Sequence, residues 1–280
     1  MGLFFNYDKP GKGVDKDAPK KKGFFLFFEL WWRKLGKLFQ ANMLYFLVSL
    51  PVFLIYHFFF FMIIAGNMPA DMNGTVTHQL VLMCTVLLSI LWGTGPVSAG
   101  YTFILRNFAR EEHVWLTSDF FDKCKENFKH CIVFFLVDLI VLVLGLNAIV
   151  FYSNLAKGGN TLFLYLMFIS VLCMLIYTFM HFYLYQFVVT FENKLRVTYK
   201  NALIMAIATM PMNLILTLIV AVCTYFVFSL LTPIAIVLLT FLCWLSFMRF
   251  PIDFYSARVI KRRLIGEQEE AEPEEIEEEV

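Results

Sequence analysis

The sequence has few charged residues and lacks the motifs that mark the common classes of enzyme. Charged residues make up 16% of its 280 positions, whereas soluble domains carry about 25%. It contains no GxxxxGK[ST] phosphate loop, no HExxH zinc motif and no GxSxG nucleophile elbow. A net charge of +1 provides no basic field for nucleic acid. We therefore expect no enzyme, no directly bound nucleotide and no nucleic-acid partner.

The six cysteines form neither a disulfide framework nor a metal pattern. Most lie in or beside apolar runs, where cysteine acts as a small apolar side chain. Cys124 lies instead in a charged segment near His130 and Cys131, but the spacing is not one that zinc sites use. We expect no metal and no cofactor.

Apolar and aromatic residues are abundant instead. Hydrophobic residues make up 60% of the chain and aromatic residues 18%, and the mean hydropathy is +0.70. A membrane-spanning helix needs about 20 mostly apolar residues. Segments of this kind cover residues 41–64, 79–105, 131–152, 161–190, 202–228 and 231–252. The sequence therefore predicts an all-α membrane protein with six transmembrane helices.

The positions of lysine and arginine predict the orientation of the chain. Cytoplasmic segments of membrane proteins are enriched in these residues. Of the 23 in the chain, only Lys157 falls on the side opposite to all the others, and the connection 65–78 has none. We expect both termini in the cytoplasm.

The two ends differ from the transmembrane domain, which we place at residues 23–264. Residues 1–22 are expected to be a cytoplasmic segment. In residues 23–40 the charged residues lie near one face of a helix, and aromatic and apolar residues fill the rest. This pattern is typical of a helix lying in the headgroup layer, either as an anchor or as a contact for a partner. Residues 265–280 are a block of acidic residues, which predicts a disordered cytoplasmic tail.

Three similar stretches suggest an internal repeat. "LFQANMLYFLVSLP", "NFKHCIVFFLVDLI" and "TYKNALIMAIATMP" each lead from a charged or aromatic segment into a span. Aligning Phe39, Phe128 and Tyr199 also aligns Ser49, Asp138 and Thr209. We expect three parallel units, each an elbow helix followed by a transmembrane hairpin.

The stretch "GTGPVSAG" in the second span combines glycine, proline and small residues. Pro96 removes a helical hydrogen bond near Trp92 and should kink the helix. Small residues permit close helix approach in membranes, and here they are Gly93, Gly95, Ala99 and Gly100. The expected partner is a helix of the same chain, a helix of another protein, or a pathway opened by the kink.

Asp138 stands alone as an acidic residue deep in a predicted span. Placing an ionisable group there costs about 2.5–3.5 kcal/mol or more, so the carboxyl should face protein or water. It could contact a proton, an ion or a polar substrate. It could equally make a structural hydrogen bond to a neighbouring helix, since we find no basic partner at the same depth.

The connection 105–129 combines both signs of charge with aromatic residues. A simple linker would not need its tryptophan and paired phenylalanines, and interface cores are enriched in aromatic residues and arginine. Its candidate docking residues are Arg106, Arg110, Trp115, Asp119, Phe120 and Phe121. The alternative is a helix packed on the membrane-facing side of its own protein.

The chain resembles the YesL family of bacterial membrane proteins. The resemblance rests on "FFNYDKPGKGV" near the N-terminus, "GPVSAG" with the following "YTFILRNFAREEHVWLTSDFFDKCKENFKH", and the acidic end. Members are typical of Gram-positive bacteria, and their genes commonly lie beside carbohydrate importers of the ATP-binding cassette (ABC) type. The resemblance implies a location in the plasma membrane and an accessory role beside the permease subunits of such an importer. It supplies no catalytic residue.

Two other functions remain open from the sequence. A stand-alone transporter or channel would use the space between the hairpins, with Asp138 accessible to water. A membrane scaffold or sensor would use the acidic tail.

Overall fold

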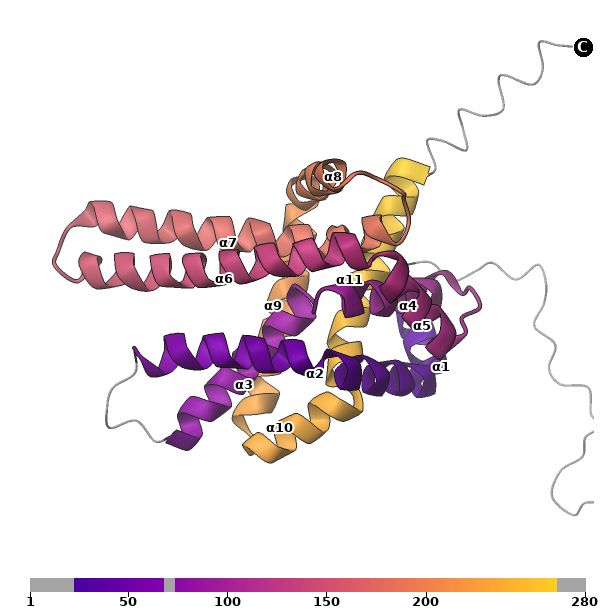
Figure 1. Ribbon diagram of the computed structural model, residues 1–280, viewed down its shortest axis with the longest axis horizontal. Coiled ribbons are helices and arrows are strands. Elements are labelled where there is room, and N and C mark those ends of the chain that lie inside the picture. The colour runs from indigo at the N-terminus through magenta and orange to yellow at the C-terminus, as the bar shows by residue number, and fades with distance from the viewer. Residues whose placement is uncertain (1–22, 68–73, 266–280) are drawn as a thin grey trace, which may run out of the picture.

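The computed structural model describes residues 23–67 and 74–265, and these ranges are helical without a strand. The helices, drawn in Figure 1, are α1 (Phe24–Arg33), α2 (Leu35–Ala65), α3 (Gly74–Leu91), α4 (Pro96–Arg110), α5 (Leu116–Glu126), α6 (Phe128–Ala156), α7 (Thr161–Val188), α8 (Leu195–Ala208), α9 (Met210–Ser229), α10 (Pro233–Leu239) and α11 (Leu245–Ile260). Two short π-helical segments follow α10 and α11, namely η1 (Thr240–Trp244) and η2 (Lys261–Ile265). The predicted segment 1–22 lies outside the described residues, as does the acidic tail from residue 266 onward.

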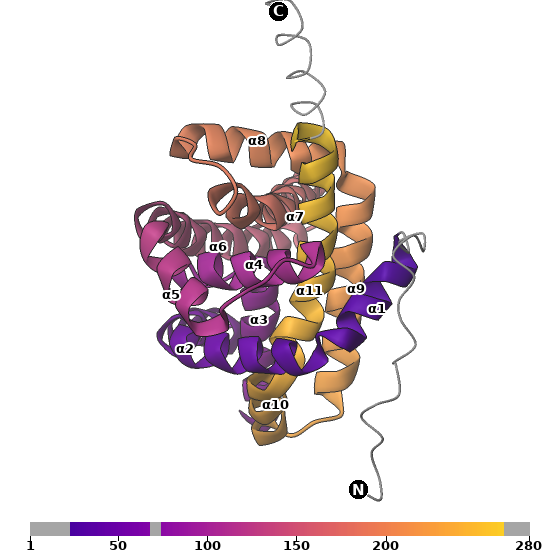
Figure 2. The same cartoon turned by 90° about the vertical axis from the view of Figure 1, so that its right-hand side faces the viewer.

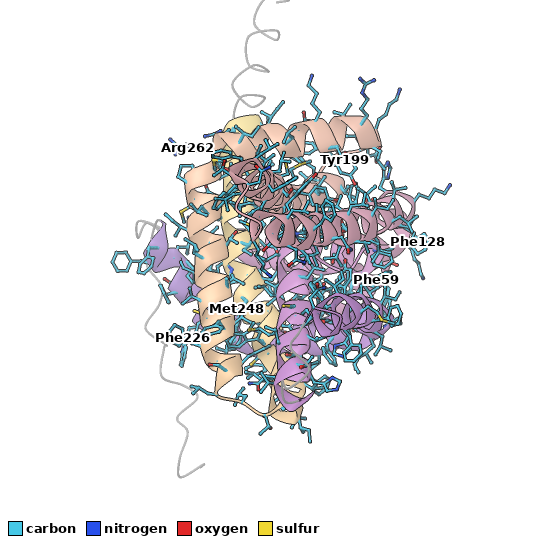
Figure 3. All side chains as sticks on the ribbon, turned by 90° about the vertical axis from the view of Figure 1, so that its left-hand side faces the viewer. Phe59, Phe128, Tyr199, Phe226, Met248 and Arg262 are labelled. Carbon is cyan, nitrogen blue, oxygen red and sulfur yellow. The ribbon has the colours of Figure 1, made fainter. Side chains whose placement is uncertain are left out.

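The helices confirm the prediction of an all-α, multi-pass membrane protein. In the described ranges, five helices are long and apolar enough to cross a membrane, and a sixth span is formed if α3 and α4 count as one bent helix. Many large apolar side chains are exposed on these helices, including Phe226 and Phe128 at the outer edges of Figure 3. Such surfaces are suited to lipid.

Several boundaries differ from those predicted. The segment 202–228 is not one helix, because α8 ends at Ala208 and α9 begins at Met210. The interfacial helix ends at Arg33 rather than at residue 40, and residues 35–40 already belong to α2. The sixth span continues past residue 252 to the end of α11.

The long helices run in two directions. In Figure 1, α2, α6 and α7 lie alongside one another, and the α6–α7 hairpin projects beyond the rest. In Figure 2 these three are seen end-on, while α9 and α11 run across them. The molecule is therefore not a simple bundle of parallel spans.

Three one-residue junctions divide short helices from long ones. Lys34 separates α1 from α2, Asn127 separates α5 from α6, and Thr209 separates α8 from α9. Their φ/ψ angles are −97°/7°, −97°/9° and −121°/20°. All three lie in or near the sparsely populated bridge region between the helical and extended conformations. Each junction therefore turns the chain without proline or glycine.

The same buried stripe follows each junction. The fourth, seventh, eleventh and fifteenth residues after it are buried in all three long helices, a spacing that keeps one helical face inward. In α2 they are Leu38, Ala41, Tyr45 and Ser49, in α6 Cys131, Phe134, Asp138 and Leu142, and in α9 Asn213, Leu216, Val220 and Thr224. The three units thus share a short helix, a junction and a long helix.

The register of the predicted repeat is wrong. The junctions align Asp138 with Tyr45 and Val220, not with Ser49 and Thr209. Thr209 is itself a junction residue, whereas Ser49 and Asp138 lie inside long helices. The predicted alignment rests on Phe39, Phe128 and Tyr199, which lie within α2, at the start of α6 and within α8, so they do not occupy equivalent places.

The π-helical segment η1 is held by one polar residue of α2. A π-turn shifts the backbone hydrogen bonds and often marks a functional or strained position. Asn42 Nδ2 donates to the carbonyls of Thr240 and Phe241 at 2.8 and 2.7 Å, and its Oδ1 accepts from the Ser246 backbone N–H at 2.8 Å. The irregular turn is therefore bonded to α2 through a fully buried amide.

Candidate functional site

The break between α3 and α4 lies at the centre of the molecule. The helix ends at Leu91, restarts at Pro96 and bends by 62°. Gly93 and Gly95 have φ angles of 87° and 67°, which favour glycine. Pro96 is the first residue of α4, where its missing N–H removes no helical bond. The predicted kink near Trp92 is thus a complete interruption of the helix.

The carbonyls freed by this break are bonded to side chains from distant helices. Arg249 Nη1 donates to the carbonyls of Ile90 and Leu91 at 2.5 and 3.3 Å. Tyr56 Oη donates to the Gly93 carbonyl at 3.2 Å. Non-helical backbone is tolerated at membrane depth only where such partners are supplied.

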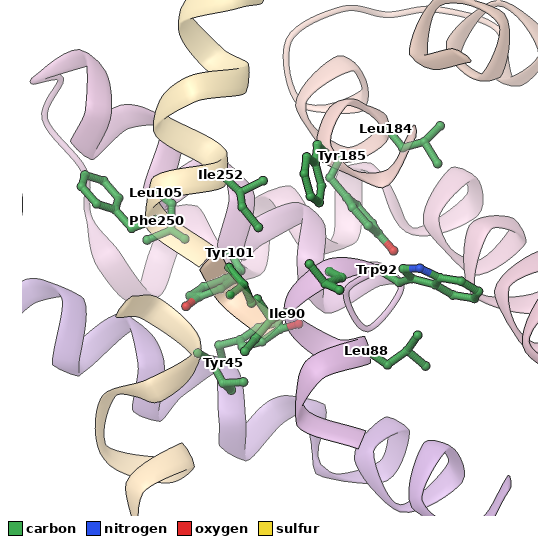
Figure 4. Close-up of a cluster of buried hydrophobic side chains, with 14 of the residues drawn as sticks. Tyr45, Leu88, Ile90, Trp92, Tyr101, Leu105, Leu184, Tyr185, Phe250 and Ile252 are labelled. Atoms are coloured by element: carbon green, nitrogen blue, oxygen red, sulfur yellow. The ribbon is translucent and has the colours of Figure 1, made fainter. Parts of the chain in front are cut away.

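The freed N–H groups are also bonded. The Thr94 N–H donates to Ser98 Oγ at 2.6 Å, and the Gly95 N–H donates to Tyr185 Oη at 3.2 Å. Tyr45 lies within hydrogen-bonding distance of both Thr94 and Ser98. Tyr45 also stacks on Tyr101, with the ring centroids 4.0 Å apart, as Figure 4 shows beside Ile90. Residues from α2, α4 and α7 therefore fix the break.

Arg249 and Asp253 form a buried ion pair that the sequence analysis missed. Arg249 Nε lies 3.2 Å from Asp253 Oδ2, and Gln186 Nε2 donates to Asp253 Oδ1 at 3.0 Å. Both charged side chains are buried. The distribution of basic residues assigns Arg249 to the cytoplasmic side, and the predicted sixth span ends before Asp253. The expectation that Asp138 is the single interior acid is therefore wrong, although Arg249 bonds to Asp253 and to the break and not to Asp138.

Asp138 lies beside His181 and Tyr177 of α7. His181 Nε2 is 2.9 Å from Asp138 Oδ1. Tyr177 Oη donates to the same oxygen at 2.7 Å. The Asp138 and His181 side chains are fully buried. The pair was not predicted because α6 and α7 bring the two residues together only after the hairpin has formed.

Several polar atoms of this cluster have unused bonding capacity. Asp138 Oδ2 and both ring nitrogens of His181 are buried and make no hydrogen bond within the described residues. The short His181–Asp138 distance thus lacks the direction of a good hydrogen bond. An unsatisfied buried polar group costs about 1–3 kcal/mol, so the arrangement is unusual for a purely structural contact.

Trp92 joins the acidic cluster to the broken helix. Its ring stacks on His181, with centroids 5.5 Å apart and an interplanar angle of 9°. Its Nε1 donates to Thr178 Oγ1 at 2.9 Å. Trp92 directly follows α3 and lies beside Tyr185 in Figure 4.

The small residues of the break pack against helices of the same chain. A Cβ on Gly95 would lie 2.9 Å from Phe135 Cβ of α6, and one on Gly100 would collide with the Phe120 carbonyl of α5. Ala99 is fully buried. In this structure, the small-residue surface is therefore covered from within the molecule.

The space beside the break is enclosed and narrow. It is lined by residues including Tyr45, Ser98, Tyr101 and Arg249, and it does not admit a water-sized sphere. The conformation described here thus has no room for a ligand at that position.

Two of the candidate docking residues are unavailable to a partner. Phe120 is fully buried and Arg106 is 7% exposed. Arg106 Nη1 donates at 2.8 Å both to the Val189 carbonyl and to Thr190 Oγ1. These residues join α4 and α5 to their own protein, which corrects their assignment to a docking surface.

The other docking candidates lie at or near the surface. Trp115 is 71% and Phe121 37% exposed. Asp119 Oδ2 accepts a hydrogen bond of 2.8 Å from the Trp115 backbone N–H at the start of α5. Arg110 lines a cleft of about 330 Å³ with Arg258 and Lys261.

The chemistry of the interior is that of ionisable and hydroxyl groups. Among the described residues, no cluster of three or more His, Cys, Asp or Glu side chains could hold a metal ion. The buried groups are joined by hydrogen bonds and by two close acid–base contacts, Asp138–His181 and Arg249–Asp253. They come from α2, α4, α6, α7 and α11 and from the break between α3 and α4.

The fold and this interior define an all-α, multi-pass membrane protein with a polar core around a broken helix. No protein-family model, curated protein or solved structure matches the chain.

Proposed function

We propose that the chain is a non-enzymatic accessory membrane protein that associates with the permease subunits of a carbohydrate ABC importer and modulates its assembly or activity. We place it in the bacterial plasma membrane with both termini in the cytoplasm. The proposal rests on the resemblance to the YesL family and on one structural observation. That observation is the exposure of Trp115, just before the short helix α5, and of Phe121 on it, outside the candidate spans.

The setting of α5 supports a role in docking. Phe120 packs inward while Trp115 remains 71% exposed. The close approach of Gly100 to the Phe120 backbone holds α5 against α4. Tryptophan is one of the residues enriched among the anchors of protein interfaces.

A pull-down experiment tests the association. The tagged protein is extracted from its native membrane in several mild detergents and its partners are identified by mass spectrometry. We expect importer permease subunits with the unmodified chain and fewer with Trp115→Ala/Phe121→Ala. Trp32→Ala is the matched control, because Trp32 is 75% exposed on α1. Recovery of no importer subunit in any detergent would rule out the association.

The buried acid and the broken helix favour a second candidate, a transporter. Interior ionisable residues often mark transport pathways, and discontinuous helices often form substrate sites in transporters. Solute flux into vesicles containing the purified protein tests this function. An absence of flux, or unchanged flux in Asp138→Asn, would count against a transporter.

The scaffold or sensor function depends on the acidic tail, which lies outside the described residues. Deletion of residues 266–280 tests it. An unchanged set of partners after this deletion would leave the tail without a role in binding them.

A further inference from the structure

The Asp138–His181 pair has features that neither lipid contact nor docking to a partner requires. Both side chains are fully excluded from solvent, and their nearest nitrogen and oxygen atoms are 2.9 Å apart. Asp138 Oδ2 and both His181 nitrogens have no hydrogen-bond partner in the described part of the chain. A carboxyl and an imidazole this close together are neutral as a pair when one of them holds a proton.

No lysine or arginine of the described residues accompanies this pair. The titratable groups that interact with Asp138 come from four helices, namely Tyr56 of α2, Cys131 of α6, Tyr177 and Tyr185 of α7, and Tyr199 of α8. The α11 helix also packs on α7, but its Arg249 and Asp253 bond to each other and to Gln186 or the break.

We propose that Asp138 and His181 form a single proton-binding site in the interior of the protein. One proton, held by either the carboxyl or the imidazole, leaves the pair neutral overall. Loss of that proton, or uptake of a second, leaves a net charge on side chains that are fully buried, which is unfavourable. The two residues then titrate as one coupled unit and not as independent groups.

The protonation state of the site reaches the broken helix through Trp92. The indole lies parallel to the His181 ring. A protonated imidazole attracts the face of an aromatic ring more strongly than a neutral one, and it also quenches indole emission. Trp92 is thus both the contact with the break and a spectroscopic reporter of the site.

Fluorescence of the full chain in lipid nanodiscs tests the proposal. The signal of Trp92 is the difference between the unmodified chain and Trp92→Phe, measured across the pH range in which both remain folded. We expect the Trp92 signal to follow a titration that His181→Gln abolishes. Asp138→Asn should change the midpoint of this titration, because the imidazole loses the carboxyl to which it is coupled.

A second variant keeps the test decisive if Asp138→Asn does not fold. Tyr177→Phe removes the hydrogen bond to Asp138 Oδ1 and should also change the midpoint, because the carboxyl of the pair loses a donor. Asn147→Ala is the control, since Asn147 lies exposed on the same helix α6.

Three results would each overturn the proposal. These are a Trp92 signal independent of pH, the same midpoint with and without the Asp138 carboxyl, and an equal shift in Asn147→Ala. None of them depends on an importer partner, so failure here is distinct from failure of the pull-down.

Discussion

The Arg249 side chain of α11 joins three parts of the interior through its guanidinium group. Its guanidinium bonds to two carbonyls of the broken helix and pairs with Asp253. Removing one partner of a buried pair leaves the other charge without compensation. The loss of stability on replacing Arg249 thus comes as much from the unpaired Asp253 carboxylate as from the hydrogen bonds that are lost.

Arg249→Met should destabilise the protein by about 3–5 kcal/mol. Reversible unfolding in mixed micelles measures the change. The double variant Arg249→Met/Asp253→Leu should lose less than Arg249→Met alone, because it leaves no buried carboxylate unpaired. A single variant within about 0.5 kcal/mol of the unmodified chain, the range of ordinary surface changes, would contradict the assigned role.

Gly100 tests the contact between α4 and α5. A methyl group on this residue would meet the Phe120 carbonyl and Cys124 Sγ. Overpacking of this kind costs about 1–3 kcal/mol, so Gly100→Ala should lower the melting temperature. Gly36→Ala is the matched control, because a Cβ there meets nothing within 4 Å. Equal melting temperatures for the two variants would disprove a tight α4–α5 contact.

The helical elements combine features that the sequence predicts with others that it does not. Long apolar runs predict spans because a helix in lipid satisfies its own backbone. The glycines and Pro96 predict a bend in this span, but they do not predict its angle. The junction residues Lys34, Asn127 and Thr209 are themselves neither glycine nor proline, and Pro211 in the first turn of α9 marks only one of the three helix starts. The pairing of Asp138 with His181 depends on how α6 meets α7.

Burial of α5 against α4 predicts the reactivity of Cys124. Burial raises the pKa of this thiol to about 11. Because the thiolate is the reacting form, labelling by maleimide should be slow at neutral pH and accelerate as the pH approaches that value. Two single-cysteine chains are compared. One keeps only Cys124, and the other has all native cysteines replaced and carries Ser118→Cys, since Ser118 is exposed on the same helix. Equal rates at neutral pH would show that Cys124 is accessible.

At the scale of the whole molecule, the α6–α7 connection lies far from α1, α4 and α5 (Figure 1). Lys157 lies at that connection, whereas Lys123 and Lys125 lie on α5. The distribution of basic residues predicts that these two regions face opposite sides of the membrane.

Labelling of intact cells checks this topology. The reagent is a maleimide that does not cross membranes, and each chain has a single cysteine. The chain with Gly158→Cys should be labelled in intact cells. The chain with Ser118→Cys should be labelled only after the cells are opened. The reverse pattern would invert the predicted orientation. Labelling of both in intact cells would mean that α5 and the α6–α7 connection share one side.

The π-turn held by Asn42 resembles a one-residue insertion in an otherwise regular helix. Deleting one residue within Thr240–Trp244 would restore regular hydrogen bonding there. It would also rotate everything that follows by about 100°, so Arg249 would no longer point toward Ile90 and Leu91. A deletion that makes the helix regular would thus break the contact that holds α3 and α4. The irregular turn therefore determines which face of α11 is directed toward the broken helix.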